Sequence, residues 1–214
     1  MRLILILTAL LAFQSAAASE FDEMKALAYQ GDADAQYNLG IMYDNGIGVP
    51  KNSAEAVKWY RKAAEQGDAD AQYNLGNMYD FGRGVPENDS EAVKWLRKAA
   101  DQSSVHAQYN LALMYDTGRG VPENVTEAAK WYRKAAHQGL AHAQYNLVIM
   151  YDNGIGVPEN NIRAYVWWSM AKTQGDTGAA SNIDILKPQM TPQQIAVGQA
   201  LAAKCYESNY KECD

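Results

Sequence analysis

The 214-residue sequence has only two cysteines, Cys205 and Cys213, and only three histidines. So few cysteines exclude a zinc-ribbon pattern and a scaffold held together by many disulfides. Basic residues are also scarce, since 19 lysines and arginines stand against 25 aspartates and glutamates, giving a formal net charge of −6. A nucleic-acid-binding protein or a polybasic membrane-surface protein carries the opposite imbalance, so the sequence argues against both. The composition, with 48% hydrophobic and 21% charged residues, is typical of a folded globular chain.

The one long apolar run lies at the N-terminus. Arg2 precedes a largely apolar stretch from Leu3 to Phe13, and small residues follow up to Ala18. This stretch is too short to cross a bilayer, which takes roughly 20 residues. The pattern predicts a signal peptide over residues 1–18 that is cleaved between Ala18 and Ser19. The mature chain is therefore expected to be periplasmic or secreted and not to span a membrane.

The rest of the sequence repeats with a period of 36 residues. The segment Ala-Gln-Tyr-Asn-Leu stands at residues 35–39, 71–75, 107–111 and 143–147. Tryptophans and prolines keep the same spacing, at Trp59, Trp95, Trp131 and Trp167 and at Pro50, Pro86, Pro122 and Pro158. A period of roughly 20–50 residues indicates a solenoid, a propeller or an array.

The first half of each repeat has the pattern of a helix. In the first repeat, Ala35, Leu39 and Met42 form an apolar stripe at helical spacing. Asp32 is placed to cap this helix. Leu140 holds the equivalent position in the fourth repeat and cannot do so, so that helix is expected to start less sharply.

The second half of each repeat predicts a second helix. Gly46 is placed to end the first helix, and Val49-Pro50 forces an extended connection. Asn52 and Glu55 resemble a capping box that opens the next helix. Its apolar stripe consists of Ala56, Tyr60, Ala63 and Ala64, and the repeated tryptophans beside it are expected in the core. Two amphipathic helices per repeat can bury their faces only against neighbouring repeats, which predicts an all-α solenoid.

These residues resemble the Sel-one-like repeat family, a relative of the tetratricopeptide repeats. The pattern Ala-x-x-x-Leu-Gly-x-x-Tyr, then Gly-x-Gly-Val-Pro, then Ala-x-x-Trp-x-x-x-Ala-Ala is matched at residues 35–64 and 71–100. Ala112 and Val148 replace its first glycine in the third and fourth repeats, so wider helix spacing is expected there. The resemblance implies a right-handed, tetratricopeptide-like superhelix of antiparallel helix pairs. A tetratricopeptide array proper would have a 34-residue period and would lack the Gly-x-Gly-Val-Pro loop.

The predicted organisation follows from this register. It comprises the signal peptide at 1–18, an N-terminal capping helix at 19–32, repeats at 33–68, 69–104, 105–140 and 141–176, and a degenerate repeat with a C-terminal capping helix at 177–214. Thr191, Pro192 and Gln194 predict the start of the last helix.

Cys205 and Cys213 are expected to form a disulfide, because export places them in an oxidising compartment. An unbroken helix would hold their Cα atoms about 12 Å apart. A disulfide tolerates only roughly 4.4–6.8 Å. The last helix must therefore end near Cys205, and residues 207–209 must turn the tail back. The alternative is two free thiols on a frayed tail.

Other motifs with chemical associations fit the repeats better than a catalytic site. Each repeat contains Gly-x-Gly, but a dinucleotide-binding loop needs a preceding strand and a third glycine. His106 and His142 lie near the starts of first helices and have no second ligand at metal spacing. Ser169 and Lys172 match the Ser-x-x-Lys of penicillin-recognising enzymes, but no Ser-Asp-Asn or Lys-Thr-Gly element accompanies them. The sequence predicts no enzyme activity, no metal site and no cofactor.

By resemblance to tetratricopeptide arrays, first-helix positions opposite the apolar stripe are expected to line a concave groove. The aspartates there include some near helix C-termini, where a negative charge does not stabilise a helix. The candidate groove residues are Asp34, Tyr37, Asp44, Asp70, Tyr73, Asn77, Asp80, Tyr109, Asp116, Tyr145 and Asp152. Near-identical repeats can also be recent copies, so these ladders of tyrosine and aspartate can be relics of duplication.

An array without a catalytic set acts through its concave surface. The predicted function is a non-enzymatic interaction scaffold of the bacterial envelope that binds a peptide, a protein or an envelope polymer. Two alternatives stay open: a β-lactamase-type hydrolase, as reported for some cysteine-rich relatives, and a glycan or peptidoglycan binder, since tyrosines can stack on sugar rings. The sequence does not identify the partner.

Overall fold

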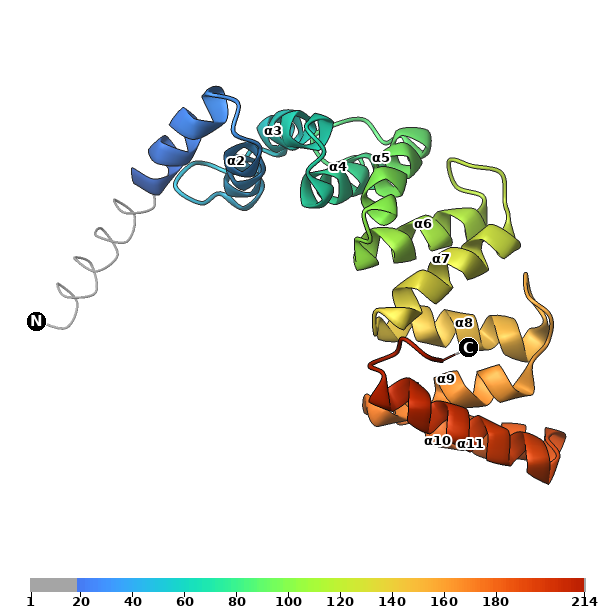
Figure 1. Cartoon of the computed structure of the whole chain (residues 1–214). Coiled ribbons are helices and arrows are strands. Elements are labelled where there is room, and N and C mark those ends of the chain that lie inside the picture. Colours follow the sequence, from blue (N-terminus) through green and yellow to red (C-terminus); the bar gives the residue numbers. More distant parts are fainter. Residues whose placement is uncertain (1–18, 214) are drawn as a thin grey trace, which may run out of the picture. The chain divides into compact units, whose positions relative to one another are not determined.

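The computed structural model describes residues 19–213, and these residues form helices and loops without a strand (Figure 1). The predicted signal peptide lies outside the described residues, as does Ala18 at its cleavage site. Residues 19–29 are helical. The following elements are α2 (Ala33–Asn45), α3 (Ser53–Glu65), α4 (Ala69–Asp80), α5 (Asp89–Asp101), α6 (Val105–Thr117), α7 (Val125–His137), α8 (Ala141–Asn153), α9 (Asn161–Thr173), α10 (Ala179–Leu186), the 3-10 helix η1 (Lys187–Gln189) and α11 (Pro192–Glu207).

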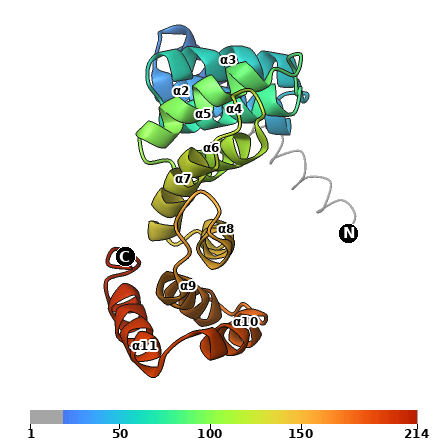
Figure 2. The same cartoon turned by 90° about the vertical axis from the view of Figure 1, so that its right-hand side faces the viewer.

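The described residues divide into two compact units: unit 1 ends at Ser104 and unit 2 begins at Val105. In unit 1, α2 packs against α3, α3 against α4, and α4 against α5. In unit 2 the same order runs from α6 to α9, and α9 also contacts α10 and α11. Figure 2 shows α10 and α11 on either side of α9. Consecutive packed helix pairs confirm the predicted all-α solenoid class.

Helix starts follow the predicted caps. Asp32 accepts a hydrogen bond from the Ala35 amide at 2.8 Å, and Asn52 accepts one from the Glu55 amide at 3.1 Å. Leu140 makes no side-chain cap, yet α8 begins at the same repeat position as α2. The predicted capping box at Asn52 is wrong in its second half. The Asn52 amide already donates to the Tyr43 carbonyl at 2.7 Å, so the Glu55 side chain instead pairs with Lys58.

The repeated tryptophans lie in the core, as predicted. Trp59, Trp95 and Trp131 are 5–6% exposed, and Trp167 is fully buried. Trp59 packs with Phe21 of the N-terminal helix and with the α2 stripe. The tryptophans therefore stabilise the helix pairs and do not form a ligand box.

Two glycine positions permit close backbone packing. A Cβ atom on Gly40 would lie 2.6 Å from the Tyr60 ring, so this glycine lets α2 and α3 of the same repeat approach. A Cβ atom on Gly84 would lie 2.3 Å from the Ser53 carbonyl group. Gly84 has a φ of 70°, which suits glycine. The Gly-x-Gly loop therefore packs on the start of the preceding repeat's second helix and does not form a phosphate loop.

A second set of contacts, which the sequence analysis does not predict, joins glutamine side chains. Gln36, Gln72, Gln108 and Gln144 are at most 5% exposed. Their side-chain oxygens accept hydrogen bonds of 2.8–3.1 Å from Gln66, Gln102, Gln138 and Gln174, respectively. We call these eight residues the amide ladder. Within unit 1, Gln72 also donates to the Ala64 carbonyl at 3.0 Å, which ties the second repeat to the first.

The C-terminal tail folds back as the disulfide requires. Cys205 is bonded to Cys213, with Cα atoms 4.4 Å apart. The helix continues to Glu207, two residues beyond Cys205, and the reversal falls at Asn209 and Tyr210, which have positive φ. The sequence therefore predicts the turn to within about a residue.

The reversed tail contacts two repeats through one residue. The Nδ1 atom of His137 donates to the Tyr210 carbonyl at 2.6 Å, and Gln174 donates to the Tyr210 hydroxyl at 3.0 Å. Gly139 lies beneath the Tyr210 ring, where a Cβ atom would come within 3.3 Å of it. Tyr210 thus connects the tail to the ends of α7 and α9.

Between residues 19 and 213, no helix has the length and apolar character needed to cross a membrane.

Candidate functional site

Three consecutive helices bring tyrosine, aspartate and asparagine side chains together in each unit. In unit 1 the group consists of Tyr37, Asp44, Tyr60 and Asn74, and in unit 2 of Tyr109, Asp116, Tyr132 and Asn146. We call these groups tyrosine cluster 1 and tyrosine cluster 2. Each combines one repeat's helix pair with the first helix of the following repeat.

In tyrosine cluster 1, the rings of Tyr37 and Tyr60 lie 6.0 Å apart between centroids. Both hydroxyl groups interact with the Asn74 side chain on α4. Burial raises the pKa of Tyr60 far above its ordinary value, and the negative charge of Asp44 raises it further. Tyr60 therefore stays neutral in the buried part of the cluster.

Asp44 of tyrosine cluster 1 is held by two partners from outside its own helix. Its carboxylate accepts a hydrogen bond from the Ser53 hydroxyl at 3.2 Å. The Arg83 guanidinium, in the Gly-x-Gly loop of the next repeat, lies 3.7 Å from its other oxygen. Asp44 thus connects α2, the start of α3 and the following loop.

Tyrosine cluster 2 has a similar ring pair with different polar contacts. The rings of Tyr109 and Tyr132 lie 5.8 Å apart, and the His142 ring is 6.0 Å from Tyr109. The Tyr132 hydroxyl interacts with Asp116 and Asn146. Its oxygen is nevertheless buried and closes no hydrogen bond of ordinary geometry within the described residues. Burial raises the pKa of the Asp116 carboxyl, against the lowering effect of the Tyr132 contact.

Sequence reasoning missed half of each cluster. The helical pattern assigns Tyr60 only to a core stripe and gives the equivalent Tyr132 no role in a site. Asn74 and Asn146 hold the same place in the repeated Ala-Gln-Tyr-Asn-Leu segment and keep the 36-residue period. That period was the available signal, because a polar residue held at one repeat position indicates a shared contact.

The other candidate groove residues differ in exposure. Asp34, Asp70 and Asp152 are exposed, Tyr73 and Asp80 are half-buried, and Tyr145 is 46% exposed. Asn77 is only 9% exposed, so this α4 side chain is buried and does not lie on the surface where the pattern predicts it. Tyr145 stands edge-on to Trp168, with ring centroids 5.6 Å apart.

The histidines and the Ser-x-x-Lys segment are the other motifs with chemical associations. No group of three histidine, cysteine or acidic side chains in the described part of the chain could hold a metal ion. The Ser169 hydroxyl donates to the Tyr165 carbonyl of its own helix at 2.7 Å, so it is not directed at Lys172. Both residues line a recess beside α10, together with Tyr165 and Ile183.

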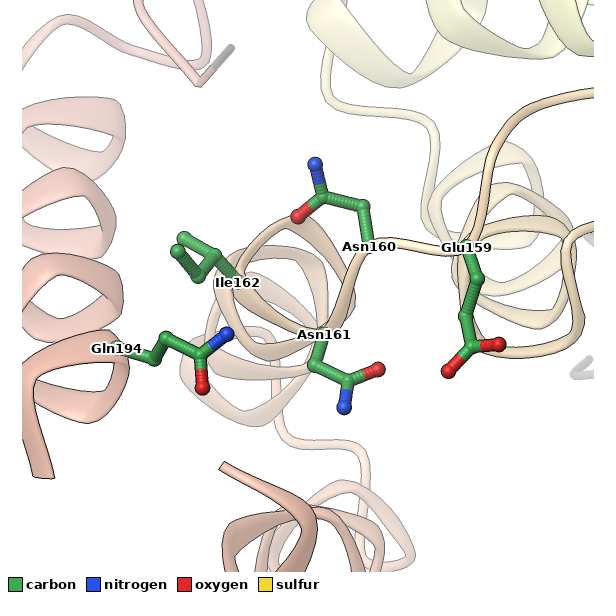
Figure 3. Close-up of a pocket in the computed structure, with 5 residues that line it drawn as sticks. All are labelled: Glu159, Asn160, Asn161, Ile162 and Gln194. Carbon is green, nitrogen blue, oxygen red and sulfur yellow. The ribbon is translucent and has the colours of Figure 1, made fainter. Parts of the chain in front are cut away.

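A separate polar recess of about 330 Å³ lies at the start of α9. Figure 3 shows Gln194 reaching from α11 toward this turn, while Asn160 points away from it. Asn161 holds the repeat position of Ser53, on which the next repeat's loop packs in unit 1. The recess is therefore the place where a further Gly-x-Gly loop would pack, and the array ends there instead.

Solved structures include clear relatives of this chain. A Sel1 repeat protein from Oxalobacter formigenes is 36% identical, with a TM-score of 0.68, and the match covers 78% of this chain and 66% of that one. A protective antigen of uropathogenic Escherichia coli strains, which displays an SLR fold, is 30% identical with a TM-score of 0.53, covering 88% and 48%. Among curated proteins, the DAP3-binding cell death enhancer 1 of Rattus norvegicus is 45% identical over 49 residues, 20% of this chain. The chain spans about a tenth of that curated relative's length.

Packed helix pairs that repeat every 36 residues and share one set of contacts define a helical repeat protein. The sequence model of the Sel1 repeat matches residues 33–68, 69–104, 105–140 and 141–176. These segments make up more than half of the sequence, so the chain belongs to the Sel1 repeat family. Proteins of this family are generally protein-interaction scaffolds, and the fold is generally non-enzymatic.

Proposed function

We propose that this protein is an interaction scaffold that binds a protein or peptide segment on the first-helix face of its repeats. The observation that carries the proposal is the apolar and aromatic area left open on that face. In unit 1, Phe81 at the end of α4 is 65% exposed, and in unit 2, Tyr145 and Ile149 on α8 are 46% and 36% exposed. Aromatic side chains such as tyrosine and phenylalanine are enriched in protein-binding surfaces.

The scaffold is proposed to act in the bacterial envelope or outside the cell. Two features support this location: the signal-peptide pattern over residues 1–18, and the disulfide between Cys205 and Cys213. Disulfides persist in oxidising compartments and are rare in the cytosol.

Site-specific photo-crosslinking tests the proposal. A photoreactive amino acid placed at Ile41 or Ile149 samples the first-helix face in each unit. The same amino acid at Lys58 or Lys130, both exposed on second helices, is the matched control. We expect a discrete crosslinked partner from the first two positions and none from the controls. Equal crosslinking from all four positions, or none from any, would contradict the assignment.

The two other functions open at the level of the sequence are separated in the same material. A glycan array run beside a peptide array distinguishes a sugar ligand from a peptide ligand. A nitrocefin assay tests β-lactam hydrolysis, which we expect to be absent because the Ser169 hydroxyl bonds its own helix.

A further inference from the structure

The aspartate at one repeat position has opposite surroundings in the two units. In unit 1, Asp44 receives a hydrogen bond from Ser53 and faces the Arg83 guanidinium. In unit 2, Val125 stands at the serine position and Ile155 at the arginine position of the equivalent Asp116. The two repeat positions that supply polar partners to Asp44 therefore hold aliphatic residues in the case of Asp116.

Asp116 is half-buried and makes no ion pair with any residue between 19 and 213. The charged side chain that acts on it is a second carboxylate, Glu123, and burial together with Glu123 raises the pKa of Asp116. A partly buried carboxylate without a cation lowers stability, because desolvation is not repaid. The exposed Asp152 escapes this cost through its contact with water. The fold thus keeps one carboxylate in an unfavourable state.

The surroundings of Asp116 suit a cation. The half-buried Tyr109 ring packs on Tyr132, the fully buried tyrosine that contacts Asp116, and a partly open aromatic face attracts ammonium and guanidinium groups. The buried Tyr132 hydroxyl closes no ordinary hydrogen bond within the described residues, so the polar groups around Asp116 are incompletely satisfied. The Asn146 side chain on α8 contacts the same hydroxyl. A planar guanidinium, with donors spread over one fork, matches several acceptors better than a compact ammonium.

We propose that tyrosine cluster 2 is a subsite for a basic side chain, arginine in preference to lysine, presented by the bound protein or peptide. The subsite rests on the proposed function and specifies its partner's chemistry. In it, the ligand's guanidinium takes the place that Arg83 occupies beside Asp44 in unit 1. Tyrosine cluster 1 is already filled by the chain's own arginine and does not compete for the ligand.

The test is an NMR titration of the uniformly ¹⁵N-labelled protein with two tripeptides. The probe is acetyl-Gly-Arg-Gly-amide, and the control replaces arginine with citrulline, which has nearly the same shape without the charge. We expect saturable shifts of the Asn146 side-chain amide and the Asp116 backbone amide with the arginine peptide, and at least tenfold weaker binding of the citrulline peptide. Asp116→Asn should weaken arginine-peptide binding at least tenfold, whereas Asp101→Asn, at an exposed position on α5 outside both clusters, should leave it unchanged.

Several outcomes overturn the subsite. These are equal binding of the two peptides, full binding to Asp116→Asn, loss of binding in Asp101→Asn, or no saturable shift at either amide. The citrulline comparison uses the unmodified protein, so it decides the matter even if a variant folds poorly. A partner crosslinked at Ile149 that ignores the Asp116 substitution refutes the subsite and leaves the scaffold function intact. Arginine binding at Asp116 without any crosslinked partner refutes the scaffold function and leaves the subsite intact.

Discussion

The amide ladder predicts that an exposed side chain contributes as much to stability as a buried one. Gln72 is 4% exposed, and its side-chain oxygen accepts one hydrogen bond, from the exposed Gln102 at 2.8 Å. Gln102→Leu removes that donor and leaves a buried amide oxygen without a partner. Such an orphaned group costs about 1–3 kcal/mol. A surface substitution ordinarily stays within about 0.5 kcal/mol.

Replacing the buried member of the pair, Gln72, is expected to cost about as much stability as replacing the exposed member, Gln102. Gln72→Leu loses its bonds to Ala64 and Gln102, each contributing about 0.5–1.5 kcal/mol net. The partners are not left bare, since the Ala64 carbonyl still accepts from the Gly67 amide and Gln102 still donates to the Gly67 carbonyl. Leucine also adds buried apolar area, so we expect a net cost of about 1–2 kcal/mol.

Urea unfolding followed by circular dichroism measures these costs, compared at a common slope. For a chain of this size each kcal/mol moves the melting temperature by about 2–4 °C. Gln199→Leu is the matched control, because this glutamine is exposed on α11 and outside the amide ladder. The double variant should cost less than the sum of the single ones, since the second substitution removes an already broken bond. A Gln102→Leu protein as stable as the Gln199→Leu control would refute the reasoning.

Three further outcomes are expected. Trp95→Ala should lower the free energy of unfolding by about 3–5 kcal/mol, because the ring is 5% exposed, and a near-neutral result in urea would place it outside the core. Asp116→Asn should raise the melting temperature at pH 7. The pKa of Asp116 is raised in the folded state, so the wild-type protein loses stability as the pH rises through that pKa. The difference in melting temperature between variant and wild type should therefore vanish near pH 3, below the ordinary aspartate pKa of about 3.9. A melting scan across this range that shows a constant gap would contradict it. Cys205 and Cys213 should resist alkylation until reduced, and intact mass should be about two hydrogens lower than for the thiols; full alkylation without reductant would disprove the bridge.

Local chemistry explains why the helices could be predicted. Asp32 and Asn52 have short polar side chains that reach a free amide three residues on, whatever the rest of the chain does. The tail reversal followed from a length argument, because a helix cannot bring residues eight apart within disulfide distance. Trp59 and its equivalents could be placed in the core because the helical spacing of apolar residues shows which face of a helix is buried.

The contacts between repeats could not be predicted in this way. Gln72 suits an exposed helix position equally well, and its burial depends on Gln102 arriving from a helix 30 residues later. The state of Asp44 depends on Arg83, 39 residues along the chain, so its sequence neighbours do not reveal it. Asn77 was expected on the surface because helix spacing cannot say which half of a polar face a neighbouring helix covers.

The contact between Tyr210 and His137 limits how this array can grow by duplication. Tyr210 binds the last repeat through Gln174 and the repeat before it through His137. Copying a repeat upstream of His137 leaves both contacts in place, since the histidine still precedes the last repeat. Copying the last repeat instead puts Thr173 at the histidine's position and removes one contact. New copies can therefore be added in the body of the array, while its final repeat and tail are inherited together.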